Sequence, residues 1–284
     1  MKTIEASDFS LKHTLECGQI FRYDLINGHY YLILGERVLK LGQQGDLLHY
    51  DSNKPADAGF VRRLFRLDED YEGMLESIGK DGFIKSAIKK SHGLRIIRQE
   101  PWECMISYIC SANSSVAKVK RCVNNLSERF GRKISFDGMK FFLFPEKIDG
   151  LAAIMECGLG YRSKHLFETL GMTDRKRLAS LRHIDCADAK AELMKLRGVG
   201  EKVADCILLY SLDFPQAFPV DRWIKRVMQE VYFGNNPVSN RKIGEHALKY
   251  FGRNAGYAQQ FLYHYTRSNA KPALFPGKVK LDVF

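Results

Sequence analysis

The clearest structural signal in this chain is the stretch LRGVGEKVADC, residues Leu196 to Cys206. The run from Asp188 to Leu196 consists of good helix formers behind an aspartate that can act as an N-cap. Gly198 and Gly200 allow backbone angles that are closed to other residues, so we expect a first helix to end at Gly198 and a second to begin near Glu201. The stretch predicts two helices joined by a glycine hairpin over about residues 188–213.

The start of the second helix is a candidate anion site. Amide groups at a helix N-terminus attract an anion by hydrogen bonding and by the helix dipole, without reading any base. We therefore expect a DNA phosphate at the hairpin, held by Gly198, Val199, Gly200 and Val203. A glycine pair that opens a helix is also common in proteins that bind no DNA, so this pattern alone leaves the question open.

Two side chains near the hairpin carry possible chemistry. Lys202 and Cys206 lie four residues apart and share one face of the second helix. Asp221 follows Pro219 and either takes part in chemistry or caps a helix that begins near Arg222. A lone helix lysine is usually solvated and a lone cysteine usually packs in a core, so only the combination indicates a site.

The segment from Lys195 to Arg226 resembles the helix-hairpin-helix, Gly/Pro-rich loop and aspartate signature of DNA base-excision glycosylases. More narrowly, it is similar to the 8-oxoguanine DNA glycosylase/lyase family. Other segments that agree with the narrower match are CGQIFRY at 17–23, the run at 99–117, GLGYR at 158–162 and AGYAQ at 255–259. The resemblance implies a bifunctional enzyme that excises 8-oxoguanine from duplex DNA and nicks the strand by β-elimination.

The resemblance assigns the catalytic roles to Lys202 and Asp221. It implies that Lys202 attacks C1′ of the sugar and forms a Schiff base, for which the amine must be neutral. Asp221 then stabilises the positive charge that develops on the deoxyribose as the base leaves. This chemistry requires no metal and no organic cofactor, and similar hairpins suggest only a monovalent cation on the hairpin carbonyls.

The resemblance also implies a pocket for a base swung out of the duplex. It places Cys206 on one face of that base and Tyr263 on the other. Gln259 matches the residue that bonds the Watson-Crick edge, and Gly18 matches the residue whose carbonyl senses the proton that only oxidised guanine carries on N7. Without the resemblance, Gln259 is an ordinary helix-surface residue and Gly18 an ordinary loop glycine.

Further matching positions belong to residues that enter the duplex. The resemblance implies that Tyr161 wedges beside the opposite base, while Asn113 and Arg162 meet that base or its surroundings. Lys118 stands where eukaryotic members have an arginine that helps to read the opposite cytosine, and a lysine cannot reproduce the planar guanidinium. A strict preference for cytosine opposite the lesion is therefore left open. Trp223 replaces a family histidine near a phosphate.

Composition agrees with a polyanionic partner. The 284 residues include 44 Lys and Arg against 33 Asp and Glu, a formal net charge of +11, although many soluble proteins are basic without binding DNA. Seven scattered cysteines without a Cys-x-x-Cys pair argue for reduced thiols and against a zinc or iron-sulfur module. We expect a soluble intracellular monomer that binds lesion-containing double-stranded DNA and no membrane, cytoplasmic and nucleoid-associated in a bacterium or nuclear in a eukaryote.

The patterning along the chain predicts an α+β protein. From Ile20 to Tyr50, short apolar runs are separated by Asn27-Gly28, Gly35-Glu36 and the segment from Gly42 to Gly45, which are hairpin signals. After about Pro55 the apolar period becomes helical, and we expect helix for most of the remainder. The predicted units are residues 1–90, an antiparallel sheet domain with following helices, and residues 91–284, a helical glycosylase core.

The sequence leaves two alternatives open. A glycosylase for another damaged base would keep Lys202 and Asp221 but use Gly18 and Gln259 differently. A non-catalytic helix-hairpin-helix protein that binds DNA would keep the hairpin and the basic charge, and would need neither Lys202 nor Asp221.

Overall fold

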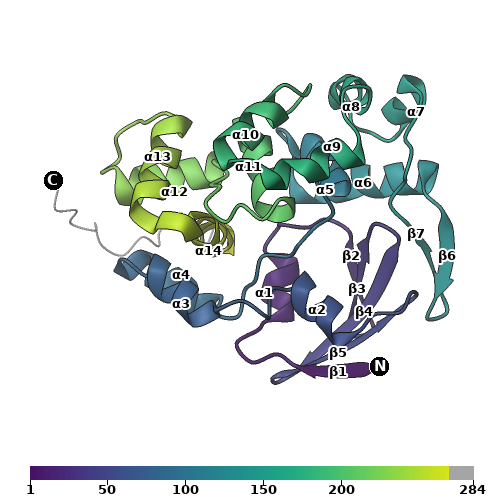
Figure 1. Ribbon diagram of the computed structural model, residues 1–284, viewed down its shortest axis with the longest axis horizontal. Helices are drawn as coiled ribbons and strands as arrows, with labels where there is room; N and C mark the ends of the chain where they lie inside the picture. The colour runs from purple at the N-terminus through teal and green to yellow at the C-terminus, as the bar shows by residue number, and fades with distance from the viewer. Residues whose placement is uncertain (269–284) are drawn as a thin grey trace.

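A five-stranded antiparallel sheet at the N-terminal end packs beside a mainly helical core (Figure 1). The computed structural model describes residues 1–268. In the sheet the strand order is β1-β5-β4-β3-β2. Its strands are β1 (Lys2–Glu5), β2 (Tyr23–Ile26), β3 (His29–Leu34), β4 (Arg37–Gln44) and β5 (Leu47–Ser52). The predicted fold class, a sheet domain on a helical core, is confirmed.

Two-residue turns join the successive strands β2 to β5. Asn27-Gly28 and Gly35-Glu36 lie at the predicted positions, and Asn27 and Gly28 have φ of 49° and 79°, as a tight hairpin requires. The third turn is Gly45-Asp46, because β4 continues through Gly42 to Gln44; the prediction of a longer turn there is wrong. β1, which pairs with β5, was not predicted.

Alternate residues of the sheet enter two different hydrophobic clusters. Tyr30 and Leu32 of β3 pack with residues of α1 (Leu11–Glu16) and α2 (Ala58–Leu64). Tyr31 and Ile33 point to the other face and pack with Phe141 of a second hairpin, β6 (Lys133–Phe136) and β7 (Met139–Phe142). Helices and a hairpin therefore cover the two faces of the sheet, as the pleat of β3 requires.

The β6–β7 hairpin interrupts a part of the chain that was expected to be helical. Its turn is Asp137-Gly138, and both residues have positive φ, 52° and 73°. An Asp-Gly pair between two short runs of alternating polarity is a hairpin signal, so the sequence does contain the information for this turn. The Tyr31 and Phe141 rings stack at 5.5 Å, which ties this hairpin to the sheet.

The helical core occupies the remainder of the described residues (Figure 1). Its earlier helices are α3 (Tyr71–Ile78), α4 (Gly82–Lys90), α5 (Pro101–Ser111), α6 (Val116–Phe130), α7 (Leu151–Glu156), α8 (Arg162–Leu170) and α9 (Arg175–Ser180), followed by the short 3-10 turn at Leu181–His183. The later ones are α10 (Cys186–Met194), α11 (Glu201–Ser211), α12 (Arg222–Tyr232), α13 (Asn240–Phe251), a 3-10 turn at Gly252–Asn254, and α14 (Ala255–Ser268).

The helix-hairpin-helix lies where the sequence predicted it, with α10 and α11 around the glycine turn. The N-cap differs: α10 begins at Cys186 behind Asp185, so Asp188 lies in the first turn of the helix rather than in front of it. The two glycines also differ, because Gly198 has φ of 76° whereas Gly200 has φ of −91° and is extended. Only Gly198 therefore needs the conformational freedom of glycine.

The packing of α3 and α4 bears on the predicted division at residue 90. Both helices contact α14, and their buried residues Met74, Ile78 and Ile84 belong to the same hydrophobic cluster as α11 and α14. In Figure 1 they lie beside α14, on the opposite side of α1 from the sheet strands. The boundary at residue 90 stays a prediction, and packing alone would place α3 and α4 with the helical core.

Candidate active site

A cleft of about 1080 Å³ collects most of the predicted site residues. It lies where α5, α11, α12 and α14 meet the segment after α1. The predicted residues that line it are Gly18, Asn113, Gly198, Gly200, Lys202, Val203, Cys206, Asp221, Gln259 and Tyr263. Residues from four distant parts of the chain therefore face one space.

Lys202 lies in the first turn of α11, and its side chain is half-buried. Its Nζ is 3.1 Å from the hydroxyl oxygen of Ser111, at the end of α5, to which it donates a hydrogen bond. The ammonium lies 5.0 Å from the centre of the Tyr108 ring, a cation–π distance. Two residues of α5 thus contact the amine of Lys202, and Lys202 lines the cleft.

Asp221 caps a helix and also lies in the cleft, so the structure is compatible with both of the roles that the sequence left open. It is the N-cap of α12, and its carboxylate accepts a hydrogen bond from the amide of Ile224 at 2.8 Å. It also lines the cleft with Lys202. Burial raises the pKa of Asp221 above its ordinary value, and the amide of Ile224 and the charge of Lys202 act against that rise. The cap fixes the carboxylate in the cleft, where it faces the amine's charge.

Cys206 and Tyr263 supply the thiol and the aromatic ring that the resemblance requires. Cys206 is buried one helical turn after Lys202, and burial raises the pKa of its thiol to about 12, so it is neutral at physiological pH. Tyr263 is half-buried on α14. Both side chains are therefore uncharged surfaces of the cleft, suited to contact with a flat base.

Gln259 lines the cleft and carries an unsatisfied acceptor. The residue is only 4% exposed, so it is not the helix-surface glutamine that its position in the sequence allowed. Its Oε1 atom is buried and has no hydrogen-bond partner among residues 1–268. A buried amide oxygen without a partner is costly, which suits a group that bonds a ligand in the cleft.

Gly18 is held in place by its neighbours on both sides. The carbonyl of Cys17 accepts a hydrogen bond from Gln260 of α14 at 3.1 Å. Gln19 is fully buried; its side chain bonds the backbone of the segment 95–97, and its carbonyl accepts hydrogen bonds from Gln99 and Tyr108. Gly18 itself has φ of 89°, a conformation that favours glycine.

The hairpin presents open amides to the cleft. Gly200 is the N-cap of α11 and provides no side-chain cap, so the amides of the first turn, including that of Val203, have no such partner. The amide of Val199, by contrast, donates to the carbonyl of Leu196 at 3.2 Å. A phosphate at this end would therefore meet the amides of α11 and not that of Val199.

The residues expected to enter the duplex are placed less uniformly. Tyr161 is 57% exposed at the start of α8, and Asn113 is exposed in the loop after α5 with φ of 49°. Lys118 is exposed on α6 outside the cleft lining. Arg162 is only 5% exposed and donates to the carbonyls of Ala112, Leu159 and Asn113, so in this structure its guanidinium supports the loops and does not face outward.

Several cleft residues were not predicted as site residues. Ser111 and Tyr108 contact the Lys202 amine, and Trp223, noted in the sequence only as a departure from the family, lines the cleft beside Asp221. Arg267 also lines it. A signal for Arg267 was present, because it follows Gln259 and Tyr263 at spacings of eight and four on one helix face.

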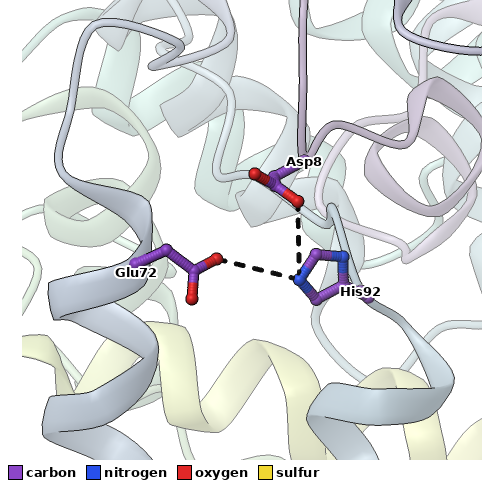
Figure 2. A group of neighbouring side chains, drawn as sticks. All are labelled: Asp8, Glu72 and His92. Atoms are coloured by element: carbon purple, nitrogen blue, oxygen red, sulfur yellow. Dashed lines mark ion pairs between the residues drawn. The ribbon is translucent and has the colours of Figure 1, made fainter.

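A separate cluster of possible metal ligands lies outside this cleft (Figure 2). Asp8, Glu72 and His92 bring their ligand atoms within 4.8 Å of one another, and Nε2 of His92 is 4.0 Å from each carboxylate. All three residues are exposed, and exposed ion pairs of this kind contribute little. The cluster links the segment after β1 to α3.

Within residues 1–268, no helix combines the length and apolar character needed to cross a bilayer. All seven cysteines are free thiols, of which Cys186 is half-buried and the others are buried.

Comparisons with known proteins point in one direction. Residues 2–105 match the model of the 8-oxoguanine DNA glycosylase N-terminal domain. The chain is 33% identical to a probable N-glycosylase/DNA lyase of Methanothermobacter thermautotrophicus over 73% of this chain and 74% of that one. It is 27% identical to the N-glycosylase/DNA lyase of Saccharomyces cerevisiae over 98% and 88% of the two chains.

A solved structure agrees with these relatives. The 8-oxoguanine glycosylase/lyase of Clostridium acetobutylicum, in complex with double-stranded DNA that contains cytosine opposite 8-oxoguanine, superposes with a TM-score of 0.85. The two chains are 31% identical, and the match covers 95% of this chain and 98% of that one. The fold and the sequence therefore agree over nearly the whole length.

Proposed function

The chain belongs to the 8-oxoguanine DNA glycosylase/lyase family, and from this premise we propose that it excises 8-oxoguanine through a covalent adduct of Lys202, with Asp221 assisting. It is a DNA repair glycosylase with lyase activity, and its partner is double-stranded DNA.

One observation carries the assignment: an amine and a carboxylate, Lys202 and Asp221, line the same cleft as the neutral side chains of Cys206 and Tyr263. A glycosylase needs these two groups at the anomeric carbon and the neutral surfaces around the base. A protein that only binds DNA through the hairpin has no use for either charged group in a cleft. The presence of Lys202 and Asp221 in one cleft therefore favours an enzyme over a non-catalytic DNA-binding protein.

In the proposed reaction, the neutral amine of Lys202 attacks C1′ while the bond from C1′ to N9 breaks and its electron pair leaves with the base. Asp221 stabilises the positive charge on the sugar in this step, which requires its ionised form. The amine adduct opens the sugar ring to a Schiff base. Loss of a proton from C2′ then expels the 3′ phosphate, which is the β-elimination that nicks the strand.

Recognition precedes this chemistry, because C1′ is reached only when the nucleotide is swung out of the duplex. We assign the two faces of the base to Cys206 and Tyr263. The unpartnered Oε1 of Gln259 supports an acceptor role on the Watson-Crick edge. Gly18, held by Gln19 and Cys17, is assigned the test of the N7 proton. The backbone clamp supports a carbonyl that keeps its position when the base enters.

The duplex-facing assignments follow the same reasoning. Tyr161 and Asn113 are exposed and keep the proposed roles in the space left by the flipped nucleotide. For Arg162 we propose a positioning role, through the carbonyls that it binds in the Asn113 loop. The amides at the start of α11, including that of Val203, together with Gly198 and Gly200, are assigned to a DNA phosphate.

The test is borohydride trapping on a duplex that contains 8-oxoguanine. Borohydride reduces a Schiff base to a stable amine, so the wild-type protein should form a covalent protein–DNA adduct. Lys202→Gln should form none. Lys225→Gln is the matched control, because Lys225 also lines the cleft. An adduct that persists in Lys202→Gln and is lost in Lys225→Gln would contradict the assignment.

The role of Asp221 needs a separate comparison. Asp221→Asn should slow single-turnover excision by about 100-fold or more while DNA binding changes little, since the charge acts on the transition state. The Asn side chain retains an oxygen for the Ile224 amide, so the helix cap is largely kept. Unchanged excision in Asp221→Asn would refute the role. A panel of other damaged bases distinguishes 8-oxoguanine from alternative substrates.

A further inference from the structure

Three cleft residues follow one face of α14 at spacings of four: Gln259, Tyr263 and Arg267. Residues four apart on a helix lie on the same face, and each such step advances about 6 Å along the axis. Tyr263 therefore lies between the other two. A base stacked on the Tyr263 ring would have Gln259 at one end and Arg267 at the other.

The guanidinium of Arg267 is held at the Gly18 end of the cleft. Its Nη2 donates a hydrogen bond to the carbonyl of Glu16, two residues before Gly18. Its Nη1 would lie only 2.7 Å from a Cβ atom placed on Gly18, and the guanidinium carbon is 5.4 Å from the centre of the Tyr263 ring. The side chain is half-buried. The Arg267 guanidinium, a charged group with several hydrogen-bond donors, thus lies beside Gly18, whose carbonyl is assigned to the N7 proton.

Resting on the proposed function, we propose that Arg267 is a specificity-determining residue that donates a hydrogen bond to the C8 oxygen of the flipped base. A purine whose Watson-Crick edge faces Gln259 directs its five-membered ring to the opposite end. C8 is bonded to N7, so its oxygen lies next to the proton assigned to the Gly18 carbonyl. Undamaged guanine carries hydrogen at C8, which accepts nothing from a guanidinium.

The charge of Arg267 also bears on the chemical step. When the bond from C1′ to N9 breaks, its electron pair stays with the base, which becomes more negative. A guanidinium fixed beside the base stabilises that charge in the transition state more than in the bound substrate. Removal of Arg267 should therefore lower the rate of excision as well as lesion affinity. It should not affect the later elimination, which takes place after the base has left C1′.

The test compares single-turnover rates of the wild type and Arg267→Leu on three duplexes. The first contains 8-oxoguanine; the second contains 8-thioguanine, which keeps the N7 proton but carries sulfur, a weak acceptor, at C8; the third contains an abasic site. Arg267→Leu should excise 8-oxoguanine about 10- to 100-fold more slowly, as the loss of a charged hydrogen bond implies. The loss on 8-thioguanine should be smaller, because only the effect of the Arg267 charge remains there, and cleavage at the abasic site should be unchanged.

Arg267→Lys keeps the charge without the planar fork and should recover part of the 8-oxoguanine rate. Equal losses on 8-oxoguanine and 8-thioguanine would overturn the proposal, because they would mean that Arg267 acts only by supporting Glu16 and Gly18. A comparable loss at the abasic site, or an unchanged or faster rate on 8-oxoguanine, would also overturn it. If the wild type itself excises no 8-oxoguanine, the proposed function fails, whatever Arg267 does.

Discussion

Gly198 and Gly200 of the hairpin predict opposite outcomes when each is replaced by alanine. At Gly198 the backbone has φ of 76°, and an added Cβ would lie 2.8 Å from Cβ of His165 in α8. At Gly200 the backbone is extended, and an added Cβ meets no atom of the described residues within 4 Å. The two positions are a matched pair within one turn.

The magnitudes follow from these two environments. A left-handed conformation costs a non-glycine residue about 1–2 kcal/mol. A Cβ–Cβ separation of 2.8 Å is well inside van der Waals contact, and overpacking of this kind costs roughly 1–3 kcal/mol. Gly198→Ala should therefore lose about 2–5 kcal/mol. Gly200→Ala should be neutral or gain about 0.4–1 kcal/mol, because alanine restricts the unfolded chain.

Urea unfolding and anisotropy titration with an abasic-site duplex separate stability from binding. Gly198→Ala should unfold at clearly lower urea than the wild type. Gly200→Ala should keep its stability, yet bind DNA more weakly if a phosphate approaches the open side of Gly200, where the methyl group would stand. Equal stability of the two variants would refute the steric reasoning. Wild-type DNA affinity in Gly200→Ala would refute the phosphate assignment at the hairpin.

Three further predictions concern other parts of the structure. Burial raises the pKa of Asp205 to about 6 despite its ion pair with Lys190. Between about pH 4 and 6 the folded state therefore binds a proton that the unfolded state has lost, and the free energy of unfolding falls as pH rises through that range, by about 3 kcal/mol at most. Urea unfolding of Asp205→Asn should no longer show this fall, and a pH dependence identical to that of the wild type would contradict the prediction. Lys118→Arg restores a planar fork and should raise the excision preference for cytosine over adenine opposite the lesion by about 10-fold, with an unchanged ratio as the contrary result. Arg162→Met leaves three backbone carbonyls without their hydrogen-bond donor. It should lower the free energy of unfolding by roughly 3 kcal/mol and slow excision at least about 10-fold. The control Lys164→Met replaces an exposed residue and should change neither stability nor excision.

Local signals predicted the elements that local chemistry determines. Asn27-Gly28 and Gly35-Glu36 form turns in which Asn27, Gly28 and Gly35 adopt positive φ, as their residue types allow. The glycine hairpin was predicted because a run of helix formers ends at a glycine. The N-cap of α10 is Asp185, three residues before the predicted Asp188; the carboxylate of Asp185 makes no capping hydrogen bond, so side-chain chemistry does not distinguish the two aspartates.

Elements that depend on distant partners were missed. β1 has four residues, and only its pairing with β5 makes it a strand. The β6–β7 hairpin is stable where it covers the sheet, through Phe141 against Tyr31. The sequence therefore predicted the sheet itself and missed the strands that attach to its edge and face.

The same distinction holds for the site. The resemblance predicted that Lys202, Asp221, Gln259 and Tyr263 share one site, and all four line one cleft. This succeeds because residues that match a family motif occupy the same places in the shared fold. It could not show that the guanidinium of Arg162 is used by backbone carbonyls. These hydrogen bonds depend on loop conformations, which a sequence motif does not specify.

The bonds that Gln19 makes to the segment 95–99 have a consequence for how this protein can change over evolutionary time. Gly18, the residue before Gln19, belongs to the N-terminal part of the chain that contains the sheet. The groups that bind its neighbours, Gln260 and the segment 95–99, belong to the part of the chain that follows. If Gly18 detects the N7 proton as proposed, a chimera that exchanges the first fifty residues for those of a distant homologue should keep the amine of Lys202 but distinguish damaged from normal guanine less well. We therefore expect the residues that determine substrate choice and the residues that form the contact between these two parts to change together during evolution.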